Sequence, residues 1–386
     1  MRINKGYGKL NKILFLFLFS GGLILSAVGF GSAQTPAPRP AASPPKPKID
    51  KSGIKTKIKL KGLSVSPIVP SVECEEEETR PTVRWAPASA PEAQAEKSIE
   101  VNGKVAVTLC VSQGEVKING WNRNEIRAFV NRGSQVGFSV LAKSENKKPV
   151  HVKVLGYDPT REEEGFGRDE CLYGKLIQLD VPFGASVKIK SRESKMTIES
   201  VTKAWVENSG GSVFFNNVSQ GIDAKTFEGN VTVRNSSGAM TLETTTGNIV
   251  AYEASSDSFG DFFRARTIRG AITLQQIGYR DTEVNTNSGS INFIGKILSG
   301  GQYYFGSSES VITLFVPEDT SAKIVAFYGY GQLVSEFLFK EKQKENNEGL
   351  QSFNGIIGGG DARINFKTVH GKIYLRKQKP IFLVDQ

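Results

Sequence analysis

One template of alternating residues recurs along residues 98–376 and limits the possible fold more than any other feature of the chain. Two apolar residues alternate with variable ones, a Thr, Ser or Asn follows, a Gly or Ser comes three places later, and two more alternating apolar residues close the template. Clear copies span 222–233, 263–274, 282–293 and 364–375, and the same frame fits 107–118, 187–198, 204–215, 240–251 and 303–314. Alternation with a period of two is typical of β-strands, and amphipathic helical patterns are almost absent. We therefore expect an all-β fold.

The spacing of the copies predicts how the strands are arranged. Each copy reads as a strand, a corner at the Gly or Ser, and a second strand. Between residues 194 and 310 the corner residues follow one another at intervals of 17 to 23 residues. Coils of about 20 residues are typical of a β-solenoid, in which each coil packs on its neighbours. The alternative is a β-sandwich of antiparallel hairpins; we favour the solenoid because hairpins rarely keep one corner formula through many copies.

The alternation also predicts which side chains are buried. We expect inward rows in the stacked strands at Val231, Val233, Ile272, Leu274, Ile291 and Phe293. The residues between them, Thr232, Thr273 and Asn292, should face outward.

A second motif appears in both halves of the chain. Ile177-x-Leu179-x-Val181-Pro182 matches Ile312-x-Leu314-x-Val316-Pro317. Proline has no N–H to donate to a neighbouring strand, so each segment should lie at a strand end or an exposed edge.

Together these motifs resemble the bacterial putative-adhesin family, a domain of unknown function with a β-solenoid form. The resemblance rests on Leu-x-Val-Pro, on the repeated Thr-x-x-Gly corners and on the opening segment 114–121, and it covers about residues 98–376. It implies a fold and an adhesin-like role, with no catalytic residues to carry over. The chain departs from a regular array at about 139–171 and 332–360, where we expect insertions, and 377–386 should form a C-terminal tail.

The N-terminus predicts export. Four basic residues precede an apolar run over 13–30, and Gly31-Ser32-Ala33 suits cleavage by signal peptidase, so we expect a signal peptide over 1–33. The alternative is an uncleaved membrane anchor, since a run of this length just spans a bilayer. Residues 34–97 are rich in Pro, Lys and Glu and should form a disordered linker. The exported protein would be periplasmic, bound to the cell surface, or secreted.

The charge distribution argues against a nucleic-acid partner. Removing residues 1–33 lowers the formal net charge from +10 to +6, because this segment holds four basic and no acidic side chains. Much of the remainder lies at Lys46 to Lys61 in the linker, where peripheral contact with an anionic membrane is one reading and a solvated linker the other. Residues 98–386 carry only about +3, whereas nucleic-acid binding would call for a basic stripe on the folded part.

Catalytic and metal-binding constellations are sparse, so we expect no catalytic residues, no cofactor and no metal. The two histidines, His151 and His370, are far apart in sequence. An acidic cluster lies at Asp158, Glu162, Glu163, Glu164, Asp169 and Glu170, but Arg161 and Arg168 interrupt it and the spacing is not that of an EF-hand. The enzyme alternative is a β-helical polysaccharide lyase or hydrolase, for which Asp257 and Asp261 are the closest pair of carboxylates.

The three cysteines leave several pairings open. Cys110 lies in the first strand and Cys171 precedes the Leu-x-Val-Pro strand, so we favour a Cys110–Cys171 disulfide that ties the first insertion to the domain. Alternatively, Cys110 is a free thiol, or Cys74 is the partner of either one.

These observations favour a noncatalytic, adhesin-like module that binds a glycan or protein at the cell envelope or surface. The aromatic residues at outward positions of the repeat, Phe214, Tyr252 and Tyr374, are the expected partner contacts, with packing between coils as the alternative reading. A periplasmic sensing partner of a membrane protein fits the same features.

Overall fold

Strands alone make up the regular structure of the described part of the chain. In the computed structural model, residues 94–157 and 171–378 are described, and these ranges contain 25 β-strands and no helix. The all-β prediction is therefore confirmed for these residues. The predicted signal peptide, most of the predicted linker, the acidic cluster at 158–170 and residues 379–386 lie outside the described residues.

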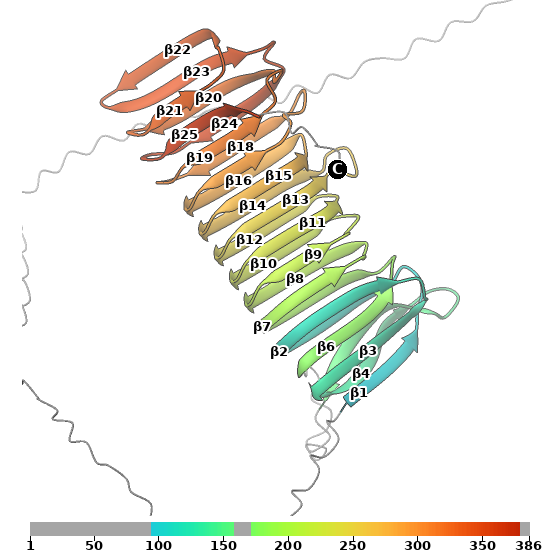
Figure 1. Cartoon of the computed structure of the whole chain (residues 1–386). Helices are drawn as coiled ribbons and strands as arrows, with labels where there is room; N and C mark the ends of the chain where they lie inside the picture. Colours follow the sequence, from blue (N-terminus) through green and yellow to red (C-terminus); the bar gives the residue numbers. More distant parts are fainter. Residues whose placement is uncertain (1–93, 158–170, 379–386) are drawn as a thin grey trace, which may run out of the picture. The chain divides into compact units, whose positions relative to one another are not determined.

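The repeat region forms two parallel ladders that run side by side (Figure 1). Ladder A contains, in spatial order, β7 (Ser186–Glu199), β8 (Lys203–Gly210), β10 (Ile222–Glu228), β12 (Met240–Thr246), β14 (Phe262–Arg269), β16 (Asp281–Ser288), β18 (Gln302–Ser307), β24 (Ala362–Lys367) and β20 (Ala322–Gly329). Ladder B contains the second half of β7 and then β9 (Val213–Asn216), β11 (Val231–Ser237), β13 (Ile249–Ser255), β15 (Ile272–Gly278), β17 (Ile291–Ile294), β19 (Ile312–Val316), β25 (Lys372–Lys377) and β21 (Gln332–Ser335). Each pairing within the two ladders is parallel, whereas a sandwich of hairpins would pair these strands antiparallel.

The core lies between the two ladders and is built from the alternate residues that the template predicts. Val231, Val233, Ile272, Leu274, Ile291 and Phe293 all have 0% exposure, whereas Thr232, Thr273 and Asn292 between them are partly exposed. In-register pairing places like positions over one another, so that Ile249 lies between Val231 and Ile272. The inward rows are therefore continuous along the ladders.

The corner between a ladder A strand and the following ladder B strand explains why the template contains Thr-x-x-Gly. Gly229, Gly247 and Gly270 have φ of 148°, 153° and 151°, a region that L side chains rarely adopt. A Cβ atom on each would also clash with the carbonyl oxygen of the corner glycine one turn earlier. The buried Thr244 hydroxyl donates to that same carbonyl, from Oγ1 to Gly229 O at 3.0 Å, and Thr267 repeats the bond to Gly247 O at 3.0 Å.

A second corner repeats along ladder B without an obvious sequence formula. Asn217, Asn235, Glu253 and Gln276 all have positive φ, between 45° and 56°. Each follows an outward-facing residue of β9, β11, β13 or β15, and the residue after each is buried. Because Asn, Glu and Gln all occupy this position, no single residue type identifies the corner in the sequence.

Antiparallel strand pairs cover both ladders at one end and ladder A at the other. At one end, β2 (Ala106–Trp121) pairs with β7 on one side and with β5 (Pro149–Tyr157) and β6 (Leu172–Pro182) on the other. Beyond these lie β3 (Glu125–Gly133), β1 (Gln94–Glu100) and β4 (Gln135–Lys143), all paired antiparallel. At the other end, β23 (Leu350–Ile357) pairs antiparallel with β20 and with β22 (Lys340–Asn347). The segments expected as insertions thus contribute strands that cap the exposed edges.

After each Leu-x-Val-Pro motif, the chain continues on the far side of a strand that another part of the chain supplies. Pro182 is the last residue of β6 and Pro317 follows β19 directly, which confirms the prediction that each lies at a strand end. Strands β6 and β7 lie on opposite sides of β2. In the same way β18 and β20 lie on opposite sides of β24, so the last two strands of the chain insert between earlier ones.

Two predicted boundaries shift. Residues 94–97, expected in the disordered linker, belong to β1, where Ala95 is buried and pairs with Val130. The polar sequence of this strand hides it, because an edge strand needs few apolar residues. At the other end, Lys377 belongs to β25 and pairs with Val316, so the regular structure extends one residue into the expected tail.

Candidate functional site

The outer face of ladder B brings together two of the three aromatic residues predicted as partner contacts. Phe214 on β9 and Tyr252 on β13 line one depression of about 380 Å³. Tyr252 is 37% exposed and Phe214 is partly exposed. Thr232, Arg234, Glu253, Gln275 and Gln276 complete the lining. The depression therefore combines aromatic rings with hydroxyl, amide and charged groups.

Tyr374 lies elsewhere on this face. In the ladder, three strands, β15, β17 and β19, separate β25 from β13, a separation of about 19 Å between Tyr252 and Tyr374 at the usual strand spacing. The Arg376 guanidinium lies 5.0 Å from the Tyr374 ring centroid and 6.0 Å from that of Phe315. Tyr374 thus belongs to a separate cation–π cluster on the same face.

The outer face of ladder A carries a column of alternating charges, which we call the charge column. In register along the strands it contains Lys190, Glu207, Lys225, Glu243, Arg266 and Asn285. Lys190 Nζ lies 3.3 Å from Glu207 Oε2, and Lys225 Nζ lies 3.3 Å from Glu243 Oε2. Exposed pairs of this kind contribute about 0–1 kcal/mol each to folding stability. The charge column therefore matters mainly for what this surface can bind.

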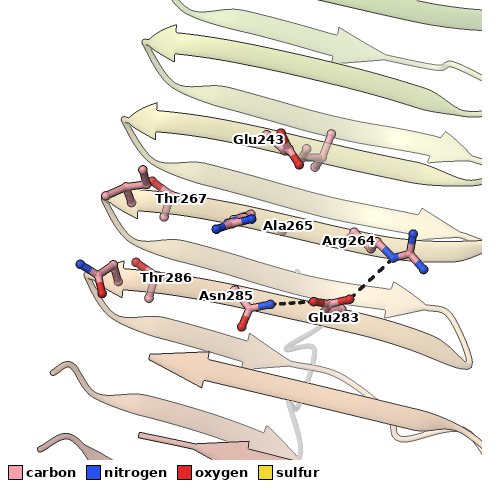
Figure 2. Close-up of a pocket in the computed structure, with 11 residues that line it drawn as sticks. Glu243, Arg264, Ala265, Thr267, Glu283, Asn285 and Thr286 are labelled. Carbon is pink, nitrogen blue, oxygen red and sulfur yellow. Dashed lines mark hydrogen bonds and ion pairs between the residues drawn. The ribbon is translucent and has the colours of Figure 1, made fainter. Parts of the chain in front are cut away.

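A depression of about 460 Å³ opens on this face where the charge column crosses β12, β14 and β16 (Figure 2). Arg264 and Arg266 of β14 lie between Glu243 of β12 and Glu283 of β16. Figure 2 shows Glu283 between two partners: Arg264 Nε at 3.7 Å and Asn285 Nδ2 at 2.9 Å. Ile268, Asn287 and the buried residues Thr267 and Thr286 form its edge toward the glycine corner.

A second column, formed by Lys188, Trp205 and Asp223 on β7, β8 and β10, runs beside the charge column. Lys188 Nζ lies 4.6 Å from the Trp205 ring centroid. Partial burial raises the pKa of Asp223, and the Glu243 carboxylate raises it further. Neither column was predicted, although reading the outward positions of the template across its copies would have revealed the alternating charges.

Of the two carboxylates considered for an enzyme, Asp257 and Asp261, the Asp261 carboxylate holds a turn together. Asp261 Oδ2 accepts hydrogen bonds from the backbone N–H groups of Asp257 at 2.8 Å and Ser258 at 2.7 Å. Both bonds direct the Asp261 carboxylate oxygen into its own loop. This geometry gives Asp261 a structural role.

The remaining polar candidates are also accounted for by local contacts. His151 Nε2 lies 3.1 Å from Thr108 Oγ1, and the His370 ring stacks on Tyr330 with centroids 5.4 Å apart. Among the described residues, no group of three or more His, Cys, Asp or Glu side chains is arranged to hold a metal ion. Nor does any helix in residues 94–157 or 171–378 have the length and apolar character needed to cross a membrane.

A disulfide joins Cys110 to Cys171, with their Cα atoms 4.5 Å apart. Cys110 lies on β2 and Cys171 directly precedes β6, so the bond links two neighbouring strands at the capped end of the ladders. This is the pair favoured from the sequence, and Cys74 lies outside the described residues.

Comparison with known proteins gives no family for this chain. No protein-family model and no curated protein matches it. Among solved structures, it is similar to a putative cell adhesion protein from Clostridium sporogenes, at 10% sequence identity and a TM-score of 0.24, over 75% of this chain and 100% of that one. The function proposed below therefore rests on the chain's own surfaces.

Proposed function

We propose that this chain is a noncatalytic, exported, adhesin-like module that binds a glycan or protein of the cell envelope or surface. The two parallel ladders, joined by a repeated glycine corner, support describing the repeat region as a β-solenoid whose coils each contribute one strand to each ladder. A long, regular scaffold of this kind offers broad lateral faces for binding. Export follows from the signal sequence expected over residues 1–33.

The observation that carries this proposal is the depression between Phe214 and Tyr252. Aromatic rings in a polar surface suit the apolar faces of sugar rings, while Thr232, Arg234 and Gln275 supply hydrogen-bonding groups for hydroxyls. The same combination suits a protein loop with an apolar side chain at its centre. A glycan is the first candidate, because the depression is open and polar side chains surround its two aromatic rings.

A second candidate function is a sensing role in which the chain binds a membrane protein instead of an external surface. The part of the expected 34–97 linker that precedes β1 would provide reach along the membrane in either case. A carbohydrate-active enzyme is the weaker alternative, because Asp261 is directed into its own loop.

Removing the aromatic contacts tests the binding role. We expect Phe214→Ala combined with Tyr252→Ala to reduce capture of native envelope glycans by the exported chain by about tenfold or more, since each ring supplies stacking contacts. Tyr374→Ala is the matched control, because it removes an aromatic residue from the same face outside the depression and should leave capture unchanged. Equal capture by the wild-type chain and the double variant, measured on the same glycan preparations, would contradict the proposed site.

A further inference from the structure

The depression on the outer face of ladder A contains one arginine whose charge has no partner among the described residues. Glu243 is paired with Lys225 at 3.3 Å, and Glu283 is paired with Arg264 at 3.7 Å. Arg266 is exposed and lines the depression, and its side chain makes neither an ion pair nor a hydrogen bond within residues 94–157 and 171–378. Both carboxylates that line the depression are thus paired with other cations, which leaves the Arg266 guanidinium as the lining charge without a partner.

The charge column explains why Arg266 is the charge left without a partner. Up to this point each cation is followed along the ladder by an anion, in the order Lys190, Glu207, Lys225, Glu243. After Arg266 the next position is Asn285, whose amide nitrogen already donates to Glu283. The guanidinium is thus left with a neutral neighbour on the side where the alternation predicts a carboxylate.

The groups around Arg266 suit a ligand that carries hydroxyls as well as an anionic group. The exposed Asn287 accepts a hydrogen bond through Oδ1 from Ser308 Oγ at 2.7 Å, which directs its amide nitrogen away as a donor. The carboxylates of Glu243 and Glu283, with their charges balanced by Lys225 and Arg264, still have oxygen lone pairs that accept hydrogen bonds from hydroxyls. A guanidinium binds a carboxylate through two parallel hydrogen bonds.

We propose that this depression binds the carboxylate of an acidic saccharide, with Arg266 as the anchor and Glu243 and Glu283 as acceptors for the neighbouring sugar hydroxyls. The depression lies along stacked strands that continue on both sides, so a polymer of uronic acids could extend along the face (Figure 2). An acidic peptide fits less well, because its side chains lack hydroxyls that could donate hydrogen bonds to Glu243 and Glu283. This site lies on ladder A and is independent of the Phe214–Tyr252 depression on ladder B.

Oligosaccharides that differ only in charge provide the test. The full exported chain is titrated with hexagalacturonate and with its methyl ester, which keeps the hydroxyls and removes the carboxylate charge. We expect the ester to bind at least about tenfold more weakly, and Arg266→Gln to weaken hexagalacturonate binding to a similar degree. Arg269→Gln is the matched control, because it removes the same charge from the same strand outside the depression and should bind like the wild type. Binding of the acid should also weaken with added salt.

Three results would overturn the proposal. The acid and its ester could bind equally to the wild-type chain, or Arg266→Gln and Arg269→Gln could weaken binding equally, which would indicate nonspecific charge. Hexaglutamate could bind as tightly as hexagalacturonate, which would identify an acidic-peptide site. The Phe214→Ala/Tyr252→Ala variant should retain the acid-dependent binding. The two proposed sites are therefore tested separately, and a negative result for one does not contradict the other.

Discussion

At the residue scale, the fold depends on a few backbone positions that allow no side chain. The corner glycines Gly247, Gly270 and Gly289 lie against the carbonyl oxygen of the corner glycine one turn earlier, and the Thr three residues before each donates a hydrogen bond to that oxygen. The Thr-x-x-Gly motif is thus a single structural device, in which the glycine permits the approach and the threonine satisfies the buried carbonyl.

Neighbouring glycines allow a matched test of this device. Gly211 has φ of 101°, and a Cβ there would clash with Ser194 O. A Cβ at Gly210 would meet its nearest atom, Arg192 O, at 3.7 Å, which is ordinary contact. We expect Gly211→Ala to lower the free energy of unfolding by about 2 kcal/mol or more and Gly210→Ala to change it by less than about 1 kcal/mol. Urea denaturation measures both, and equal losses would contradict the close-approach explanation.

Buried tyrosines predict a loss of stability at alkaline pH. Tyr279 donates a hydrogen bond to Gly238 O at 2.7 Å, Tyr303 donates to Tyr279 O at 2.9 Å, and burial raises the pKa of both phenols. The folded state therefore holds these protons more tightly than the unfolded chain. Their contribution is fully present below the ordinary tyrosine pKa of about 10 and is lost as the pH rises above it.

Tyr279→Phe tests this pH dependence. The variant should lose about 1 kcal/mol at neutral pH, because the hydrogen bond to Gly238 is gone, and its stability should then fall less steeply above pH ~10 than that of the wild type. Denaturant unfolding at neutral pH and above pH ~10 gives, for each protein, the change of the free energy of unfolding with pH. Parallel slopes would show that Tyr279 does not contribute to alkaline unfolding.

At the element scale, each strand separates an inward row from an outward one. Ile272 is fully buried, whereas its neighbour Thr273 lies on the outer face of ladder B. We expect Ile272→Ala to cost about 2–5 kcal/mol and Thr273→Ala to cost less than about 0.5 kcal/mol. Thermal or urea unfolding of the two single variants measures the difference. Similar costs for both would mean that the strand does not alternate between core and solvent.

The sequence predicted these rows because burial on one face forces a period of two along each strand. It did not predict the second corner, since the positive φ of Asn217, Asn235 and Glu253 depends on the path of the chain and different residues adopt it. The polar strand β1 was missed for a related reason, as its pairing with β3 does not require an apolar pattern. For the candidate sites, the sequence identified outward aromatics, but only the strand register shows that Phe214 and Tyr252 share a depression and that Tyr374 does not.

At the scale of the whole molecule, the order of strands in space differs from their order in the chain. Strands β24 and β25 lie between turns that precede them in sequence, and β2 lies between β6 and β7. The late strands β24 and β25 and the early strand β2 thus lie inside the stack of strands, and hairpins lie at its ends. The hairpins beside β2 and β20 cover edges that would otherwise be open to edge-to-edge association.

Cross-linking distinguishes this order from a simple array. Tyr304 lies in register with Asn365, and Asn365 lies in register with Val325. In a Cys74→Ser background, Tyr304→Cys with Asn365→Cys should be joined by a thiol reagent that spans about 5 Å, one strand spacing. Tyr304→Cys with Val325→Cys, two spacings apart at about 10 Å, should not be joined. Mass spectrometry of the digested products reads the result, and the opposite pattern would place β20 directly beside β18.

The central functional claim is that the outer faces of the ladders bind a glycan or protein without catalysing its breakdown. The most direct measurement follows binding and sugar release in one sample, by titrating the exported chain with captured envelope glycan while assaying for new reducing ends and unsaturated sugars. We expect saturable binding with no sugar released, with or without divalent metal. Metal-dependent release that Asp257→Ala or Asp261→Ala abolishes would contradict the claim and show that the chain is a carbohydrate-active enzyme.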